Sequence, residues 1–406
     1  MNETVFFTVT NYFYLNKALA LKKSFNEFNP NIKFIIYLFE ERDFIPSTNF
    51  EDEYLLVSEL NIPNYYNLAF KYDVVEFTTS LKPYLTLNLL DSYTNVVFLD
   101  PDTFVYKDFN YLLELLNKRD IILSPHYISP ILNEKDSDLG MMKYGSFNLG
   151  FYAVRKSSNS LGFLNWWHDK CINQCYFESH NGLSTDQKWV SIANVFFDVY
   201  NLKHPGFNLS YWNIHERNVT RNNNEILVNG LPLFFIHYSS FIEDSKTEYL
   251  SSRASIQYKD ISDNETLKLL FNNYRKEIQN FKSTLNLKSY TYSYDKFYGM
   301  YISLLLRRIY GFNSTNFETN PFNDKILFHF AKRKRLISKN PPAKNKSEKN
   351  LGAFRKFIIK IFLKTVVYLF SGRKINNLLR MFIYLASPQR IDNLYEFKVL
   401  NKNKNN

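Results

Sequence analysis

Two aspartates one residue apart, Asp100 and Asp102, are the first residues of this sequence whose type and spacing point to chemistry. They follow the apolar run 96–99, and Pro101 lies between them. A short continuous apolar run is typical of a strand buried on both faces, and proline cannot donate to a strand ladder. The carboxylates are therefore expected at the carboxyl end of a central strand, where open α/β sheets bind ligands. Such a pair can share a divalent cation that bridges nucleotide phosphates. The alternative is a solvated turn, because Asp-Pro-Asp is also common turn chemistry.

Two further segments carry residues suited to a phosphorylated sugar. Lys82 precedes Pro83 in a segment expected close to the Asp-Pro-Asp edge, where its ammonium could neutralise a phosphate. The alternative is a solvated surface lysine. Asn148 lies between Gly145 and Gly150, which imply tight backbone bends near a ligand. Its amide both donates and accepts, which suits sugar hydroxyls, and the alternative is an ordinary turn before a strand.

A third polar segment, residues 184–187, marks the start of a helix. Ser184 or Thr185 could cap that helix, which places Asp186 and Gln187 in its first turn. A carboxylate is favourable at a helix N-terminus in any case, so Asp186 has a structural explanation that competes with a catalytic one.

An alternating α/β framework is needed to position these residues. The periodicity predicts strands at 5–9, 33–39, 96–99, 120–126 and 231–239, helices at 15–25, 85–90, 109–116, 161–171 and 263–287, and a loop at 133–144. Asn229-Gly230 is a hairpin signal. His237 falls near the end of the last predicted strand, so an apolar strand again delivers a metal-capable side chain. A β-α-β opening of this kind is typical of nucleotide-binding α/β folds.

Composition narrows the class of protein. The chain has 406 residues, and 18% of them are aromatic, which is ample for a large core. Its two cysteines, Cys171 and Cys175, form neither a disulfide framework nor a complete zinc site, so a reducing, cytoplasmic compartment is expected. The N-terminus lacks the pattern of a signal peptide. No Gly-x-Gly-x-x-Gly or Walker loop is present, which argues against a dinucleotide or P-loop site.

The positive charge lies in the last part of the chain. The net charge is +11, but from Lys332 onward 19 Lys and Arg stand against three acids, whereas residues 1–331 hold 31 basic and 36 acidic residues. Within this basic tail, Lys356, Lys360 and Lys364 form one stripe of an otherwise apolar helix. We expect that helix to lie on the inner face of the plasma membrane, after a linker at 339–350. The alternative is a helix packed on the protein's own core or on a partner.

Three other classes of protein share some of these features. A nucleic-acid-binding protein would account for the pI of about 9.2, but the aromatic-rich body is mildly acidic and no nucleic-acid motif is present. A nucleotidyltransferase would typically show a glycine-rich basic loop after the first strand, and this chain has none. A non-catalytic protein of the same fold that binds nucleotide sugars or acts as a scaffold remains the alternative function.

The polar segments together resemble glycosyltransferases of the GT-A fold, of the kind found in bacterial polysaccharide assembly and distantly like family 8. The resembling segments are residues 98–102, 147–151, 185–189, 208, 211–213 and 237–239. The resemblance runs from about residue 4 to residue 322. It implies a GT-A-like, Rossmann-like α/β/α sandwich over 1–245, a mostly helical extension over 246–330 and the basic tail over 331–406.

The resemblance also implies roles for individual residues. Asp100, Asp102 and His237 would hold Mn²⁺ or Mg²⁺ together with the diphosphate of the donor. The other implied positions are Thr8, Asn11 and Tyr12 near the nucleoside, Lys82 near the phosphates, Asn148 near the donor sugar, and Asp186 and Gln187 near the anomeric carbon or acceptor. One departure is Ser240, where such enzymes often have glycine.

The expected reaction is metal-dependent transfer of a sugar, from a UDP-linked donor, to a bacterial surface glycan or glycolipid. An inverting enzyme would need a base, for which Asp186 is the candidate, whereas a retaining enzyme would not need that base in the same place. The residues do not decide between the two.

Overall fold

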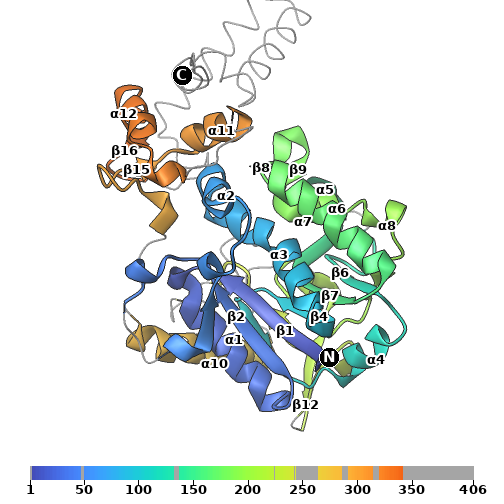
Figure 1. Cartoon of the computed structure of the whole chain (residues 1–406). Coiled ribbons are helices and arrows are strands. Elements are labelled where there is room, and N and C mark those ends of the chain that lie inside the picture. The colour runs from blue at the N-terminus through green and yellow to red at the C-terminus, as the bar shows by residue number, and fades with distance from the viewer. Residues whose placement is uncertain are drawn as a thin grey trace, which may run out of the picture. The chain divides into compact units, whose positions relative to one another are not determined.

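The computed structural model describes residues 2–46, 50–131, 137–223, 225–241, 243, 264–285, 291–313 and 320–341 (Figure 1). The chain forms two compact units. The first contains residues 1–63 and 74–291, and the second contains residues 64–73 and 292–406. The linker and amphipathic helix predicted in the basic tail fall almost wholly outside the described residues.

A seven-stranded sheet is the centre of the first unit. Its order is β10 (Tyr200–Asn201), β6 (Ile121–Pro125), β7 (Phe147–Arg155), β4 (Tyr93–Leu99), β1 (Asn2–Thr10), β2 (Lys33–Leu38) and β3 (Tyr54–Leu56). All neighbours are parallel except that β7 runs antiparallel to both β4 and β6. The expected central strand is therefore confirmed as β4, which lies between β1 and β7.

Helices cover both faces of this sheet, which explains the unbroken apolar runs in its strands. On one face, Phe6 of β1 packs with Phe25 of α1 (Leu15–Phe28) and Leu112 of α4 (Asn110–Leu116). On the other, Tyr152 of β7 stacks on Phe98 and meets Trp167 of α6 (Ser158–Gln174) edge to face. On that face α6 also packs on α3 (Val74–Leu90). The α/β/α class predicted from the sequence is confirmed.

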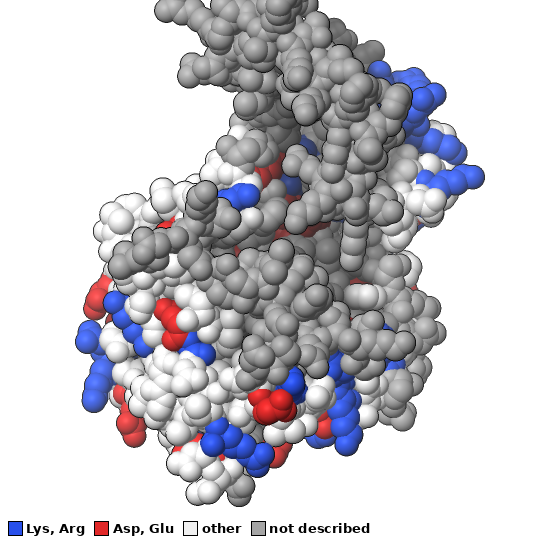
Figure 2. Space-filling view, turned by 180° about the vertical axis from the view of Figure 1, so that it is seen from behind, with Lys and Arg blue, Asp and Glu red and all other residues white. Residues whose placement is uncertain are grey.

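The remaining elements of the first unit are short, apart from one helix. They are α5 (Ser137–Tyr144), α7 (Thr185–Val190), α8 (Ala193–Phe196), α10 (Glu265–Thr284), β5 (Thr103–Val105) paired with β14 (Phe235–His237), β8 (Phe177–Glu178) paired with β9 (Leu183–Ser184), and the sheet of β11 (Val219–Asn222), β12 (Glu225–Val228) and β13 (Leu231–Pro232). The long helix, α10, packs on α1, and Asn264 caps it by accepting from the Leu267 amide. Blue and red side chains are interspersed over the described part of the face in Figure 2, as expected for a body of mixed charge.

Three sequence predictions about local structure need correction. Residues 137–144 form the helix α5 rather than part of a loop. The predicted strand 231–239 is broken: β13 pairs with β12 through the predicted Asn229-Gly230 turn, and β14 pairs separately with β5. Ser184 occupies the N-cap position of α7 without a capping side-chain bond, and the Thr185 hydroxyl donates to the Ser184 carbonyl instead.

The second unit joins helix α2 (Tyr65–Lys71) to a late part of the chain: α11 (Leu304–Asn313), α12 (Lys325–Arg333) and the strand pair β15 (Tyr301–Ile302) and β16 (Ile337–Ser338). Phe70 of α2 contacts the rings of Tyr310, Phe322 and Phe328. The buried Arg307 guanidinium donates to the carbonyls of residues 69, 70, 72 and 292 at 2.6–3.0 Å. No helix in the described parts of either unit is long and apolar enough to span a bilayer.

Candidate functional site

The structure brings Asp100, Asp102 and His237 together at the carboxyl end of β4. One ligand atom from each lies within 4.8 Å of the other two. His237 Nε2 is 3.1 Å from Asp102 Oδ1 and 3.7 Å from Asp100 Oδ2. Burial by itself would raise the pKa of Asp102, but the charge and hydrogen bond of His237 lower it to about 2. Burial lowers the pKa of His237, and the charges of the two aspartates more than compensate and raise it. Attraction between the imidazole and the carboxylates therefore favours the charged forms of both His237 and Asp102.

The pairing of strand β5 with strand β14 brings His237 close to the two aspartates. Strand β14 aligns His237 with Thr103, and the Tyr238 amide donates to the Asp102 carbonyl at 2.7 Å. Asp100 precedes the turn, where its carbonyl accepts from the Thr103 amide and hydroxyl at 3.0 and 2.8 Å. The predicted turn chemistry and the predicted carboxylate pair thus coexist at the same residues.

Gly150 makes room for the imidazole. A Cβ on Gly150 would lie 2.3 Å from Cε1 and 2.4 Å from Nδ1 of His237, which is closer than atoms can approach. Of the two predicted backbone bends, the one at Gly145 is confirmed by φ +118°. The other is wrong, because Gly150 lies within the extended strand β7 and its glycine serves the close packing of a ring.

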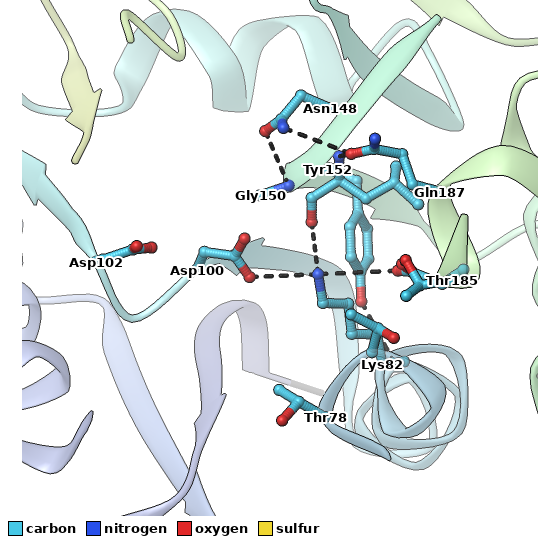
Figure 3. A network of polar contacts seen from close by, with 12 residues as sticks. Thr78, Lys82, Asp100, Asp102, Asn148, Gly150, Tyr152, Thr185 and Gln187 are labelled. Atoms are coloured by element: carbon cyan, nitrogen blue, oxygen red, sulfur yellow. Dashed lines mark hydrogen bonds and ion pairs between the residues drawn. The ribbon is translucent and has the colours of Figure 1, made fainter. Parts of the chain in front are cut away.

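A chain of hydrogen-bonded amide side chains begins at Nδ1 of His237, the ring nitrogen that does not face the aspartates. Asn208 Oδ1 is 3.3 Å from His237 Nδ1, and Asn208 Nδ2 donates to Asn148 Oδ1 at 3.0 Å. Asn148 Oδ1 also accepts from the Gly150 amide at 3.1 Å, and Asn148 Nδ2 lies 3.4 Å from Gln187 Oε1 (Figure 3). Asn208 is fully buried, yet the sequence singled it out only through the family resemblance.

Lys82 is buried beneath Asp100, on the side away from Asp102 (Figure 3). Its ammonium donates to the Leu149 carbonyl at 2.8 Å and lies 3.2 Å from Asp100 Oδ1 and 3.8 Å from Asp186 Oδ2. Burial lowers the pKa of Lys82, but Asp100 and Asp186 outweigh burial and raise it. The predicted proximity to the Asp-Pro-Asp edge is confirmed, and the alternative of a solvated surface lysine is wrong. Helix α3 presents this side chain to the sheet and not to water.

Asp186 is 1% exposed and lies in the first turn of α7. Its Oδ1 accepts from the Thr185 hydroxyl at 3.1 Å, whereas Oδ2 has no hydrogen-bond partner among the described residues. Burial is the main cause that raises its pKa to about 6, against the opposing charge of Lys82. A carboxyl that titrates close to neutral pH in such a place is suited to proton transfer.

Gln187 is fixed by backbone groups. Its Oε1 accepts from the Leu149 amide at 3.2 Å, and its Nε2 donates to the Tyr144 carbonyl at 2.9 Å. Gln187 therefore lies beside Asn148, and its amide is engaged in holding β7.

The residues expected near a nucleoside lie at the carboxyl end of β1, the strand next to β4. The hydroxyls of Thr8 and Tyr12 are buried without a hydrogen-bond partner among the described residues, and Asn11 accepts from the Tyr14 amide at 3.0 Å. No sequence motif points to Glu40, which lies just beyond β2 and accepts from the amides of Tyr12 and Thr291 at 3.5 and 3.4 Å. Burial raises the pKa of Glu40 to about 7 against these bonds.

Ser240 keeps the backbone shape that glycine would favour. Its φ of +54° lies in the left-handed region, where a side chain other than Asn, Asp or Gly is uncommon. The serine at this position thus adopts the backbone conformation that glycine adopts readily.

A family model described as nucleotide-diphospho-sugar transferase matches residues 62–181, a segment that includes Lys82, Asp100, Asp102 and Asn148. The Bacillus subtilis proteins YfnF and YfnD, both described as uncharacterized, are 25% and 24% identical over 181 and 203 residues. These matches cover 42% and 48% of this chain but only 58% and 62% of the relatives, which is less than two thirds of their length.

Solved structures with a similar fold include galactosyltransferase LgtC with donor and acceptor sugar analogues, at 12% identity, TM-score 0.39 and coverage of 70% of this chain and 97% of that one. Glycosyltransferase GlyE of Streptococcus pneumoniae is 13% identical, with TM-score 0.39 and coverage of 73% of this chain and 67% of that one. These scores are too low to carry residue roles across. The match over residues 62–181 shows that this part of the chain is similar to nucleotide-diphospho-sugar transferases, and the expected glycosyltransferase resemblance is confirmed.

Proposed function

We propose that this protein is a metal-dependent glycosyltransferase that moves a sugar from a nucleoside-diphosphate donor, expected to be UDP-linked, to a bacterial surface glycan or glycolipid. The observation that carries the proposal is the convergence of Asp100, Asp102 and His237 at the carboxyl end of the central strand, with the buried Lys82 behind Asp100. The match to the nucleotide-diphospho-sugar transferase family covers both aspartates and the lysine and supports the same reading.

The side chains present suit a divalent metal. Two carboxylates and one imidazole form a donor set that Mn²⁺ accepts well and Mg²⁺ accepts through its oxygens. When bound, such a cation would stabilise the charge that develops on a departing nucleoside diphosphate. Lys82 holds Asp100 in place through its ion pair, and Asn148 lies beside this cluster, where its amide could orient the donor sugar.

The proposal is tested by screening nucleotide sugars for release of nucleoside diphosphate, with and without Mn²⁺. Turnover of one donor that depends on the metal supports the proposal. Full activity in EDTA would contradict the metal assignment. Tight binding of a nucleotide sugar without any turnover, with or without acceptor glycans, would favour the non-catalytic alternative.

For Asp186 we propose the role of general base. The change Asp186→Asn is expected to lower the rate by about 10²-fold or more, because an amide cannot accept the acceptor's proton. The wild-type rate should rise with pH through about 6, where this carboxyl ionises. Steady-state kinetics from pH 5 to 8 provide the measurement.

Stability provides the second readout for Asp186. Its folded-state pKa lies above the ordinary value of 3.8, so the group favours folding below about pH 4 and loses that contribution as the pH rises through about 6. Relative to Asp186→Asn, the wild type should therefore lose stability over this window, by about 3 kcal/mol. The exposed Asp138, also in the first turn of a helix, provides the control Asp138→Asn. Normal turnover of Asp186→Asn combined with a large drop in melting temperature would assign the residue to the helix start.

We also propose that the basic tail attaches the enzyme to the inner face of the plasma membrane, close to a lipid-linked acceptor. Its 19 basic residues and the lysine stripe from Lys356 to Lys364 support this, since each basic residue near an anionic surface contributes about 1 kcal/mol. The full chain should sediment with anionic vesicles at low salt and much less at high salt. A chain that ends before Lys339 should stay in the supernatant. If the full chain also stays there under all conditions, the tail does not anchor the enzyme.

A further inference from the structure

We propose that Asn208 is a positioning residue that keeps the proton of His237 on Nδ1, so that Nε2 is the nitrogen available to a divalent cation. The proposal rests on the metal site proposed above and assigns the group that prepares it. It is carried by the orientation of three side-chain amides, which backbone groups determine.

The orientation of Asn208 follows from a backbone donor. The Gly150 amide can only donate, and it points at one atom of the Asn148 side chain at 3.1 Å, so that atom must be the carbonyl oxygen. The Asn208 atom 3.0 Å from the same oxygen must then be the amide nitrogen. The other end of Asn208, 3.3 Å from His237 Nδ1, is therefore its oxygen.

Gln187 confirms this orientation from the opposite end of the chain of amides. The Leu149 amide donates to one side-chain atom of Gln187 and the Tyr144 carbonyl accepts from the other, so both are identified without reference to Asn148. The Gln187 oxygen lies 3.4 Å from the remaining Asn148 atom, which must then be the nitrogen. Three backbone groups and three amides are thus satisfied by one arrangement only.

The consequence for His237 is a fixed tautomer. An amide oxygen has no proton to give, so Nδ1 must carry the hydrogen and donate it to Asn208. Nε2 faces Asp102 and Asp100, and once it has released the proton that it shares with Asp102 it can offer its lone pair to a cation between them. In the other tautomer, an Nε2 proton would donate to Asp102 and leave two lone pairs, those of Nδ1 and the Asn208 oxygen, facing each other.

The backbone of Asn208 suits this task. Its φ of +55° lies in the left-handed region, which Asn, Asp and Gly tolerate best. Its carbonyl accepts from Asn213 at 3.0 Å, so the main chain is held independently of the side chain. Both facts allow substitutions at this position that leave the chain path unchanged.

Two substitutions separate the acceptor role from a general structural role. Asn208→Asp keeps an oxygen toward Nδ1 but loses the bond to Asn148, whereas Asn208→Gly loses both contacts. Ser210→Ala is the control, because the Ser210 hydroxyl donates to the His237 main-chain carbonyl at 2.6 Å and does not touch the ring. The probe is Mn²⁺ alone, whose affinity for each full-length variant is measured by electron paramagnetic resonance of the free ion, alongside melting temperature.

We expect Asn208→Gly to weaken Mn²⁺ binding by about 10- to 100-fold, the range found when the partner of a metal-ligating histidine is removed. Asn208→Asp should bind Mn²⁺ at least as tightly as the wild type, although its melting temperature falls. Ser210→Ala should stay within about 3-fold. Equal losses for the Asp and Gly variants would overturn the proposal, as would wild-type affinity in Asn208→Gly. These results leave the proposed metal site standing, whereas absence of Mn²⁺ binding by the wild type would overturn the site itself.

Discussion

Asp102→Ala is expected to lower metal-dependent turnover of the nucleotide sugar by about 10³-fold or more. The change removes one of three converging ligand atoms, and a bound dication contributes several kcal/mol of transition-state stabilisation, at 1.36 kcal/mol per tenfold. The fold should survive, because the side chain lies at the sheet edge and contributes charge rather than core volume. Its lowered pKa, about 2, means that the carboxylate stabilises the metal-free protein above pH 4, so the variant should lose about 2 kcal/mol at pH 7.

The matched control is Asp91→Ala, which removes an exposed aspartate from the turn after α3. It should retain wild-type turnover and Mn²⁺ dependence. Release of nucleoside diphosphate and thermal melting, each measured with and without Mn²⁺, check both variants. Wild-type turnover by Asp102→Ala would remove this residue from the proposed metal site.

Gly150→Ala is expected to disable the metal site by displacing His237. The added methyl group would lie 2.3 Å from His237 and 2.8 Å from Asn148 Oδ1, so the ring or strand β7 has to move. Overpacking of this kind costs about 1–3 kcal/mol, and we expect turnover to fall by about 10²-fold because misplacement of catalytic groups by 1 Å has that effect.

Gly162→Ala is the control for Gly150→Ala. Gly162 lies inside α6, and a Cβ there would be 3.5 Å from the Phe197 ring, an ordinary contact. This change should leave turnover intact and raise stability by up to about 1 kcal/mol, because alanine favours helix. If Gly150→Ala retains both Mn²⁺ affinity and turnover, His237 is not held where the structure places it.

The features that the sequence predicted well are those set by local pattern. Residues 96–99 read as a strand buried on both faces, and β4 is that strand. Because parallel strands end at a common edge, the position of Asp100 followed from the pattern as well. That His237 lies close to the two aspartates was expected from the family resemblance and from its place near the end of a predicted strand. The strand that carries it, β14, is shorter than predicted.

The features that the sequence did not predict depend on contacts between distant residues. Lys82 has the same local pattern whether α3 turns it to water or to the sheet, and only the packing against β7 decides. Asn208 and Asn148 are 60 residues apart, and nothing in either segment indicates that one amide orients the other. The glycine spacing predicts a backbone bend at Gly150, because no local signal distinguishes a glycine that turns the chain from one that leaves room for a neighbouring ring such as that of His237. The domain limits at 245 and 330, the metal ligands and the catalytic roles remain predictions.

The bonds of Arg307 have a consequence for the order in which the protein can fold. Helix α2 is made early in synthesis, but the guanidinium that binds the carbonyls at its C-terminal end emerges more than 200 residues later. At 5–20 residues per second, this delay is about 10 to 40 s on the ribosome. During that time the first unit can form its sheet, while residues 64–73 wait as a loop excluded from it. A chain ended near residue 245 would never complete this step, and Phe70 of α2 would lack its ring contacts with Tyr310, Phe322 and Phe328.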